Sequence, residues 1–270
     1  MGKRPSQREP SLHSGLGKAI RMAVAGGMKT SVATNGIIMD KEAYQLCRWV
    51  GVSLDAATAK TYSVGRRGDF FKKAIGNLEA LCTVAPKSLD VAYKFLIFDY
   101  NQHEIYAACK LAKKLGARDF HARPADLRHQ GMVKQQANTY NLEKIKEQFE
   151  KCHELEDERF RVFTVTHKFN SDFTPKRKFS QCYASPICIQ LSADGNIYLC
   201  PDTRHKDEFI IGRHTKIGSI IKAWLGKRHK ELVYKTGAGM CLSRCTFSKY
   251  NEQCERLAIN KDDPMCLDFV

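Results

Sequence analysis

Strand-forming and helix-forming segments alternate through residues 14–165, and no other feature of the sequence restricts the fold as strongly. The strand-forming runs are residues 30–33, 50–54, 91–98, 118–122 and 161–165. The intervals between them carry apolar residues at helical spacing and are long enough for crossovers between parallel strands. We therefore predict an α/β fold with a parallel sheet.

The carboxyl ends of these predicted strands carry polar residues. Thr34 and Asn35 follow the first strand, Ser53 and Asp55 end the second, and Arg123 follows the fourth. In parallel sheets and barrels the chemistry lies at this edge, although strand ends also lead into loops, which are polar for other reasons. We treat these positions as candidates for a binding site.

The last third of the chain is organised around cysteines, with six of the eleven falling within residues 182–254. Two short β-prone runs joined by Asp194-Gly195 predict a β-hairpin, with Cys188 and Cys200 at its two ends. Gly237-Ala238-Gly239 then introduces a tight turn that carries Cys241 and Cys245. Cysteines in such an arrangement are typical of metal ligands in a small module.

Composition indicates a globular protein that is 43% hydrophobic, with no apolar run of about eighteen residues and no signal peptide. We therefore expect a cytoplasmic protein without a membrane span, in which cysteines serve metal binding or catalysis. The net charge of +15 suits a polyanionic partner, but no nucleic-acid module accompanies it, so nucleic acid is not the favoured ligand. Four further cysteines lie on helix faces and are expected to pack in the core: Cys47, Cys82, Cys109 and Cys152.

Several short motifs, taken in order, resemble the later part of a radical S-adenosylmethionine (radical SAM) core. They are Glu9-Pro10-Ser11-Leu12-His13, Thr34-Asn35-Gly36, Val52-Ser53-Leu54-Asp55 and Arg67-Gly68-Asp69-Phe70. The cysteines that follow resemble the SPASM or shorter twitch extension of that family. The resemblance implies a partial (β/α) barrel of the radical SAM type over residues 1–160 and a small cysteine-rich α+β metal module over residues 161–270.

The sequence departs from the family pattern in two respects. The family holds its radical cluster with Cys-x3-Cys-x2-Cys after the first strand, and that motif is absent here, while the family's Gly-Gly-Glu reads Gln7-Arg8-Glu9. The later cysteines read Cys-x3-Cys-x8-Cys, which fits a twitch module with one auxiliary cluster better than a SPASM module with two. We expect either a fragment of a longer enzyme or a degenerate relative, inactive by itself.

The resemblance also implies residues that bind S-adenosylmethionine. Glu9 would accept a hydrogen bond from the methionine amino group, and Arg67 would pair with the methionine carboxylate. The other implied positions would line the site or bind the ribose and methionine polar groups: Thr34, Asn35, Ser53 and Asp55.

For an auxiliary [4Fe–4S] cluster we favour the four cysteines that the hairpin and the turn bring together: Cys182, Cys200, Cys241 and Cys245. Cys188 competes with Cys182, and Cys254 and Cys266 are alternative ligands. Spacing alone does not separate this cluster from a Zn site, and the resemblance of the preceding core to radical SAM enzymes favours iron–sulfur.

The implied function is that of a radical SAM enzyme. Members cleave S-adenosylmethionine to a radical that abstracts hydrogen from a peptide, protein or small-molecule substrate, with electrons from a flavodoxin or ferredoxin. The alternative is a non-catalytic binding protein, stapled by zinc or iron–sulfur, that acts on RNA or a partner protein.

Overall fold

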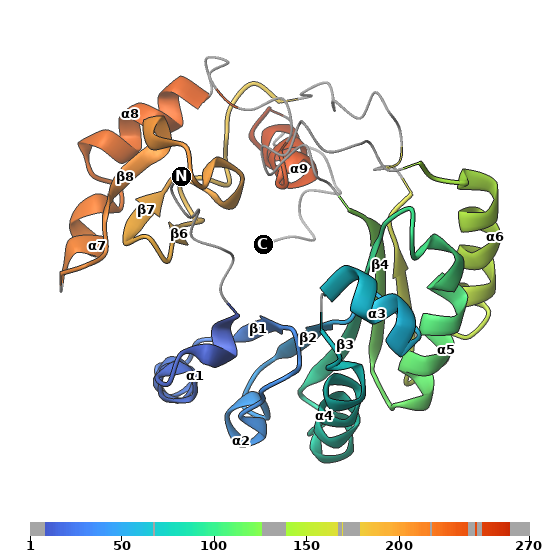
Figure 1. Cartoon of the computed structure of the whole chain (residues 1–270). Coiled ribbons are helices and arrows are strands. Elements are labelled where there is room, and N and C mark those ends of the chain that lie inside the picture. Colours follow the sequence, from blue (N-terminus) through green and yellow to red (C-terminus); the bar gives the residue numbers. More distant parts are fainter. Residues whose placement is uncertain are drawn as a thin grey trace, which may run out of the picture. The chain divides into compact units, whose positions relative to one another are not determined.

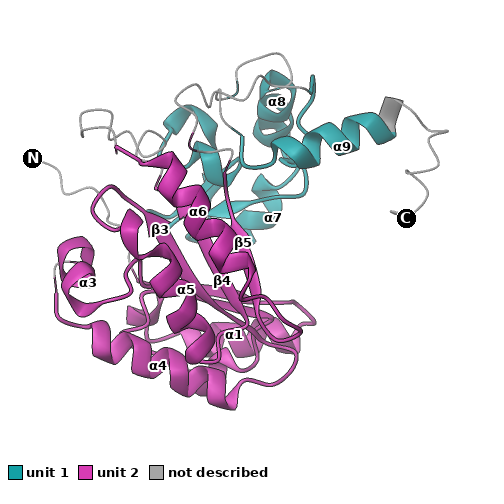
Figure 2. Cartoon of the chain, turned by 90° about the vertical axis from the view of Figure 1, so that its right-hand side faces the viewer, with its two compact units in different colours: residues 1–5, 172–270 teal, residues 6–171 magenta. Residues whose placement is uncertain are grey.

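The computed structural model describes residues 9–66, 68–125, 139–166, 169, 179–216, 218–236, 241 and 245–259. The chain divides into two compact units, which Figure 2 shows in magenta and teal. In the text, the first unit is Ser6–Ser171 (magenta, marked unit 2 in the figure), and the second unit comprises residues 1–5 and 172–270 (teal, marked unit 1). The sequence predicts a domain boundary after residue 160. The division falls later because residues 161–164 form a strand that pairs with the strand before it.

The unit Ser6–Ser171 is built on five parallel strands in the order β1-β2-β3-β4-β5. They are β1 (Ser31–Thr34), β2 (Trp49–Ser53), β3 (Asp90–Ile97), β4 (Asp119–Pro124) and β5 (Arg161–Thr164). Neighbours in the sheet are also consecutive along the chain, as in a (β/α) barrel and unlike a doubly wound sheet, whose order reverses. The predicted α/β class is confirmed, and the sheet corresponds to part of a barrel.

The longer helices of this unit lie on one side of the sheet (Figure 1). They are α1 (Leu16–Ala25), α4 (Phe71–Val84), α5 (Ile105–Lys114) and α6 (Leu142–His153), and the short α2 (Lys41–Tyr44) lies on the same side. Three shorter helices occupy connections: η1 (Pro10–Leu12), α3 (Ala59–Arg66) and η2 (Gln102–Glu104). Alternate strand residues such as Val91, Tyr93 and Phe95 are fully buried and form the core with the helices.

The opposite face of the sheet carries a row of rings. Trp49 lies 5.9 Å from the ring of His121, and His121 lies 4.7 Å from the ring of Phe163. The side chains of Trp49 and Lys94 both lie against Gly51 of β2. A Cβ added at Gly51 would come within 2.0 Å of the Trp49 ring and 2.7 Å of the Lys94 side chain. Gly51 therefore lets the indole and the lysine lie flat across β2.

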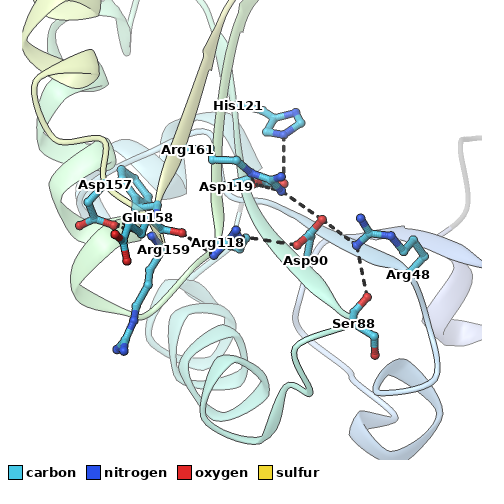
Figure 3. A network of polar contacts seen from close by, with 11 residues as sticks. Arg48, Ser88, Asp90, Arg118, Asp119, His121, Asp157, Glu158, Arg159 and Arg161 are labelled. Atoms are coloured by element: carbon cyan, nitrogen blue, oxygen red, sulfur yellow. Dashed lines mark hydrogen bonds and ion pairs between the residues drawn. The ribbon is translucent and has the colours of Figure 1, made fainter. Parts of the chain in front are cut away.

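An ion-pair network joins the amino ends of the strands (Figure 3). Asp90, the first residue of β3, accepts from Arg48 at 2.8 Å and from Arg161, the first residue of β5, at 3.0 Å. Asp119, the first residue of β4, binds Arg161 at 2.7 Å, and Arg118 lies 3.9 Å from Asp90. The network ties β3, β4 and β5 together at the edge opposite the candidate binding residues.

The unit Asp172–Val270 contains an antiparallel sheet in the order β6-β7-β8. Its elements are β6 (Gln190–Leu191), β7 (Asn196–Tyr198), η5 (Pro201–Thr203), η6 (Asp207–Phe209), β8 (Ile210–Arg213), α7 (Ser219–Ala223), α8 (Lys227–Lys235) and α9 (Ser248–Ile259). The predicted hairpin is confirmed: Gly195 has a φ of 84°, which a glycine adopts without strain. Its buried apolar cluster is small and consists of Ile197, Leu199, Phe209, Ile211 and Leu232.

Within the described residues, no helix combines the length and the apolar character that crossing a bilayer requires.

We expect Asp119→Asn to lower the free energy of unfolding by about 1–3 kcal/mol near pH 7, because Arg161 loses a charged, buried acceptor. Burial alone would raise the pKa of Asp119, but the nearby His121 and the hydrogen-bonded Arg161 lower it below its ordinary value. The stabilisation is therefore present above the ordinary aspartate pKa of about 3.9 and is lost as the pH falls through the lower folded-state pKa. Urea unfolding at neutral and acidic pH measures both effects.

Glu147→Gln is the control, because the Glu147–Lys151 pair is equally short at 2.6 Å but lies on the surface of α6. Exposed pairs contribute little to stability. Equal losses in Asp119→Asn and Glu147→Gln would contradict the role given to the buried network.

Candidate functional site

Glu9 joins the start of the first unit to the carboxyl end of β1. Its Oε1 accepts from Thr34 Oγ1 at 2.6 Å and from Ser11 Oγ at 2.8 Å, and its Oε2 accepts from the Asn35 backbone N–H at 2.7 Å. Three of the residues predicted to bind S-adenosylmethionine are thus in direct contact. The Ser11 N–H also donates to Oε1 at 3.2 Å, so Oε1 is fully used, whereas Oε2 has one donor among the described residues and keeps a lone pair for a further donor.

Tyr44 of α2 lies beneath this cluster and was not found by sequence reasoning. Its side chain is fully buried, and burial, followed by the charge of Glu9, raises the pKa of Tyr44 to about 12. The tyrosine therefore stays neutral near pH 7. Its buried ring is apolar, and its hydroxyl lies near Glu9 and Thr34.

Asp55 is buried just beyond the end of β2, with a φ of 56° that non-glycine residues rarely adopt. Its Oδ1 accepts from the Leu96 N–H at 2.8 Å, its Oδ2 pairs with Arg66, and its carbonyl accepts from Asn101 Nδ2 at 2.8 Å. Burial raises the pKa of Asp55, and the charge of Arg66 acts against this rise. Both carboxylate oxygens are engaged with the protein itself.

The arginine beside Asp55 is Arg66, whereas the sequence motif pointed to Arg67, which lies outside the described residues. Arg66 is the last residue of α3, and its side chain is 30% exposed. A guanidinium has five N–H donors, so Arg66 can hold Asp55 and still offer donors to an anion.

Further cations gather at the same edge of the sheet. Ser53, the last residue of β2, is in register with Lys94 of β3. Burial lowers the pKa of Lys94, and the nearby charges of Arg123 and Arg66 lower it further, while Asp55 raises it. Arg66 and Lys94 thus lie near the buried carboxylate of Asp55, and Arg123 lies near Lys94, so three cations gather near one buried carboxylate.

Glu104 holds the segment that joins Asp55 to α3. Its carboxylate accepts from the Ala57 N–H, Thr58 Oγ1 and Thr61 Oγ1, each at 2.8 Å. Because these donors stand at the start of α3, the buried Glu104 holds the amino end of that helix in place.

Three of the four favoured cysteines of the second unit lie near one another. Asn251 Nδ2 is 3.9 Å from Cys182 Sγ and 3.7 Å from Cys245 Sγ. Burial, together with the charges of Asp202, Cys241 and Cys182, raises the pKa of Cys245 to about 12. Such mutual repulsion between thiolates is what a bound cation relieves.

Cys200 and Cys188 reach the same region through Asp202. Cys200 precedes η5, where its sulfur accepts backbone N–H groups, and burial raises the pKa of Cys200 to about 11. Asp202 accepts from Thr246 Oγ1 at 2.6 Å and from the Thr246 N–H, which ties the Cys200 turn to the Cys245 turn. Burial and the charges of Cys182 and Asp202 raise the pKa of Cys188.

The remaining cysteines have other surroundings. Cys254 of α9 interacts with Tyr250, and Cys266 lies outside the described residues. The four cysteines of the first unit pack in or against its apolar core, as predicted: Cys47, Cys82, Cys109 and Cys152.

The donor set can be tested against the two metals considered. Among the described His, Cys, Asp and Glu side chains, no three come close enough together to hold a single metal ion. Four thiolates on one zinc stand about 3.8 Å apart, since Zn–S bonds are about 2.3 Å. The ligands of a [4Fe–4S] cluster bind different iron atoms, so they need not stand as close together as the ligands of a single ion.

A buried hydroxyl beside the cysteines also fits a bound group. The Ser185 N–H lies 3.4 Å from Cys182 Sγ, and Ser185 Oγ is buried without a hydrogen-bond partner among the described residues. Buried hydroxyls are normally hydrogen-bonded. An iron–sulfur cluster offers sulfur acceptors of the kind that this hydroxyl lacks.

Comparison with protein-family models and with curated proteins found no match. Among solved structures, Streptococcus suis SuiB bound to S-adenosylmethionine matches with a TM-score of 0.57 at 11% identity, over 83% of this chain and 54% of SuiB. SuiB bound to the precursor peptide SuiA gives the same values. Native anSMEcpe with bound AdoMet and the Kp18Cys peptide matches with a TM-score of 0.53 at 15% identity, over 93% of this chain and 73% of that one.

The chain spans about half the length of the SuiB chains that it matches. At such low identity the comparisons bear on the fold alone. Together with the five parallel strands in barrel order, they show that this chain has the fold of the radical SAM superfamily.

Proposed function

We propose that this chain is the S-adenosylmethionine- and substrate-binding part of a radical SAM enzyme, joined to a twitch-like module with one auxiliary [4Fe–4S] cluster. The observation that carries the proposal is the direct contact of Glu9 with Thr34 and Asn35 at the carboxyl end of β1. These residues were selected from separate motifs of the sequence, and Asp55 and Ser53 end the neighbouring strand.

Each candidate residue has a distinct part in holding S-adenosylmethionine. Glu9 accepts from the methionine amino group, and Arg66, in place of or together with Arg67, pairs with the methionine carboxylate. Thr34, Asn35 and Ser53 offer hydroxyl and amide groups, while Asp55 fixes Arg66 (2.5 Å). When bound, S-adenosylmethionine supplies the 5′-deoxyadenosyl group from which the family forms its radical.

The helix-free face of the sheet is the proposed substrate face. The rings of Trp49, His121 and Phe163 supply apolar contact, and Lys94 and Arg123 supply positive charge nearer the carboxyl edge. We favour a peptide substrate, because SuiB and anSMEcpe, which share this fold, were crystallised with peptides.

The cysteine-rich unit is proposed to hold the auxiliary cluster through Cys182, Cys200, Cys241 and Cys245. Cys188 is the first alternative, ahead of Cys254 and Cys266. A flavodoxin or ferredoxin is the proposed electron donor, and the net charge of +15 favours docking of an acidic carrier. Since the Cys-x3-Cys-x2-Cys motif is absent from this sequence, radical formation by this chain alone is not proposed.

Anaerobically purified protein is expected to contain about four iron and four sulfide per chain, with a brown visible spectrum. Replacing Cys182, Cys241 or Cys245 by Ala should at least halve the iron content, because each removes a thiolate from the gathered set. Cys47→Ala, in the core of the first unit, is the control and should retain the iron. Iron, sulfide and zinc assays provide the measurement.

The same assays decide between the candidate ligands and between iron–sulfur and zinc. If Cys188→Ala lowers the iron content while Cys182→Ala does not, Cys188 takes the place of Cys182. One zinc and no colour would instead support the metal-stapled binding protein and remove the iron–sulfur proposal.

Glu9→Gln should weaken S-adenosylmethionine binding by roughly tenfold, or about 1.4 kcal/mol, because the amide loses the charge that meets the methionine amino group. Equilibrium dialysis against labelled S-adenosylmethionine measures the change. Glu79→Gln, an exposed position on α4, should bind as the wild type does. Unchanged affinity in Glu9→Gln would remove Glu9 from the site.

Arg66→Met should lower the free energy of unfolding by about 2–3 kcal/mol near pH 7.5, less than for a fully buried pair because Arg66 is 30% exposed. Without Arg66 the folded-state pKa of Asp55 rises further, so folding requires proton uptake that costs more as the pH increases above the unfolded-state pKa. The loss should therefore shrink near pH 5, as judged by urea unfolding. Lys60→Met, an exposed position on the same helix, should show neither the loss nor its pH dependence.

A further inference from the structure

Asn251 links the two cysteine-bearing segments of the second unit. It lies on α9 with no exposed surface. Its Oδ1 accepts from the N–H groups of Tyr183 at 2.8 Å and Ala184 at 3.0 Å, which directly follow Cys182. Its Nδ2 faces both Cys182 Sγ and Cys245 Sγ, at 3.9 and 3.7 Å.

The orientation of this amide follows from its donors. Two backbone N–H groups point at one side-chain atom, which must therefore be the oxygen. The NH₂ group is left to face the two sulfur atoms, and it has one hydrogen for each. Asn251 thus satisfies two buried backbone donors and offers its two hydrogens to the two sulfur atoms.

We propose that Asn251 is a positioning residue for the metal site, which brings the Cys182 loop to the Cys245 turn and tunes the reduction potential of the cluster held there. This inference rests on the proposed iron–sulfur function. Hydrogen bonds to cluster sulfurs withdraw electron density and make the cluster easier to reduce. Groups next to metal ligands typically change metal affinity by about 10–100-fold when they are replaced.

Asn251→Asp separates donation to sulfur from structural anchoring. The carboxylate still accepts from Tyr183 and Ala184, but it has no hydrogen for the sulfur atoms and adds negative charge beside them. Gln253→Ala is the matched control, because it removes an exposed amide from the same helix. The full chain is reconstituted anaerobically with iron and sulfide, and metal content and midpoint potential are measured, the latter by a mediated redox titration followed by electron paramagnetic resonance.

Gln253→Ala should match the wild type in both measurements. Asn251→Asp should retain at most half of the iron, and the cluster that remains should have a more negative midpoint potential. If the site binds zinc instead, the affinity of Asn251→Asp in chelator competition should fall about 10–100-fold. A structural role alone would not shift the potential of the clusters that remain.

Asn251→Asp that matches the wild type in metal content and potential overturns the inference and leaves the cysteine ligands in place. Wild-type protein that binds neither iron nor zinc overturns both the inference and the proposed function. Far-UV circular dichroism checks folding. If Asn251→Asp does not fold, Asn251→Ala serves in its place, and a wild-type potential in that variant overturns the inference equally.

Discussion

The buried carboxylate of Asp55 is the contact on which the candidate site of the first unit depends. It joins the end of β2 to β3 through the Leu96 N–H and to α3 through Arg66, while its own carbonyl receives Asn101. Burial opposes its charge, so the arrangement holds only while Arg66 and the Leu96 N–H stay in place. The positions of Ser53, Lys94 and the other residues at the carboxyl edge of the sheet depend on these contacts of Asp55.

The second unit faces a different constraint, because its apolar cluster is small. Buried polar side chains connect segments that a larger apolar core would otherwise hold together. Asn251 connects the Cys182 loop to the Cys245 turn, and Asp202 connects the Cys200 turn to the same place. These polar contacts bring the sulfur atoms near one another, and they would lower the entropy cost of the proposed metal binding.

Local patterns in the sequence predicted the features that depend on nearby residues. The alternation of strands and helices gave the parallel sheet, and Asp194-Gly195 gave the hairpin, because both follow from neighbours along the chain. The short strand β8 was missed, since its pairing with β7 leaves no periodic signal of its own.

Partners far apart in the sequence were also missed. Asn251 reaches residues 67 to 69 positions earlier, so its role has no local pattern. The ion pair between Arg66 and Asp55 was not foreseen either, and Arg67, to which the motif pointed, lies outside the described residues and stays a prediction.

Gly51 has a practical consequence. Because this position has no side chain, the indole of Trp49 lies flat on the sheet, beside Lys94 and on the proposed substrate face. The chain has only two tryptophans, and the other, Trp224, belongs to the cysteine-rich unit. With Trp224 replaced by Phe, the protein carries a single tryptophan, on the proposed substrate face, so occupancy of that face becomes visible as a change in tryptophan emission, without an added label.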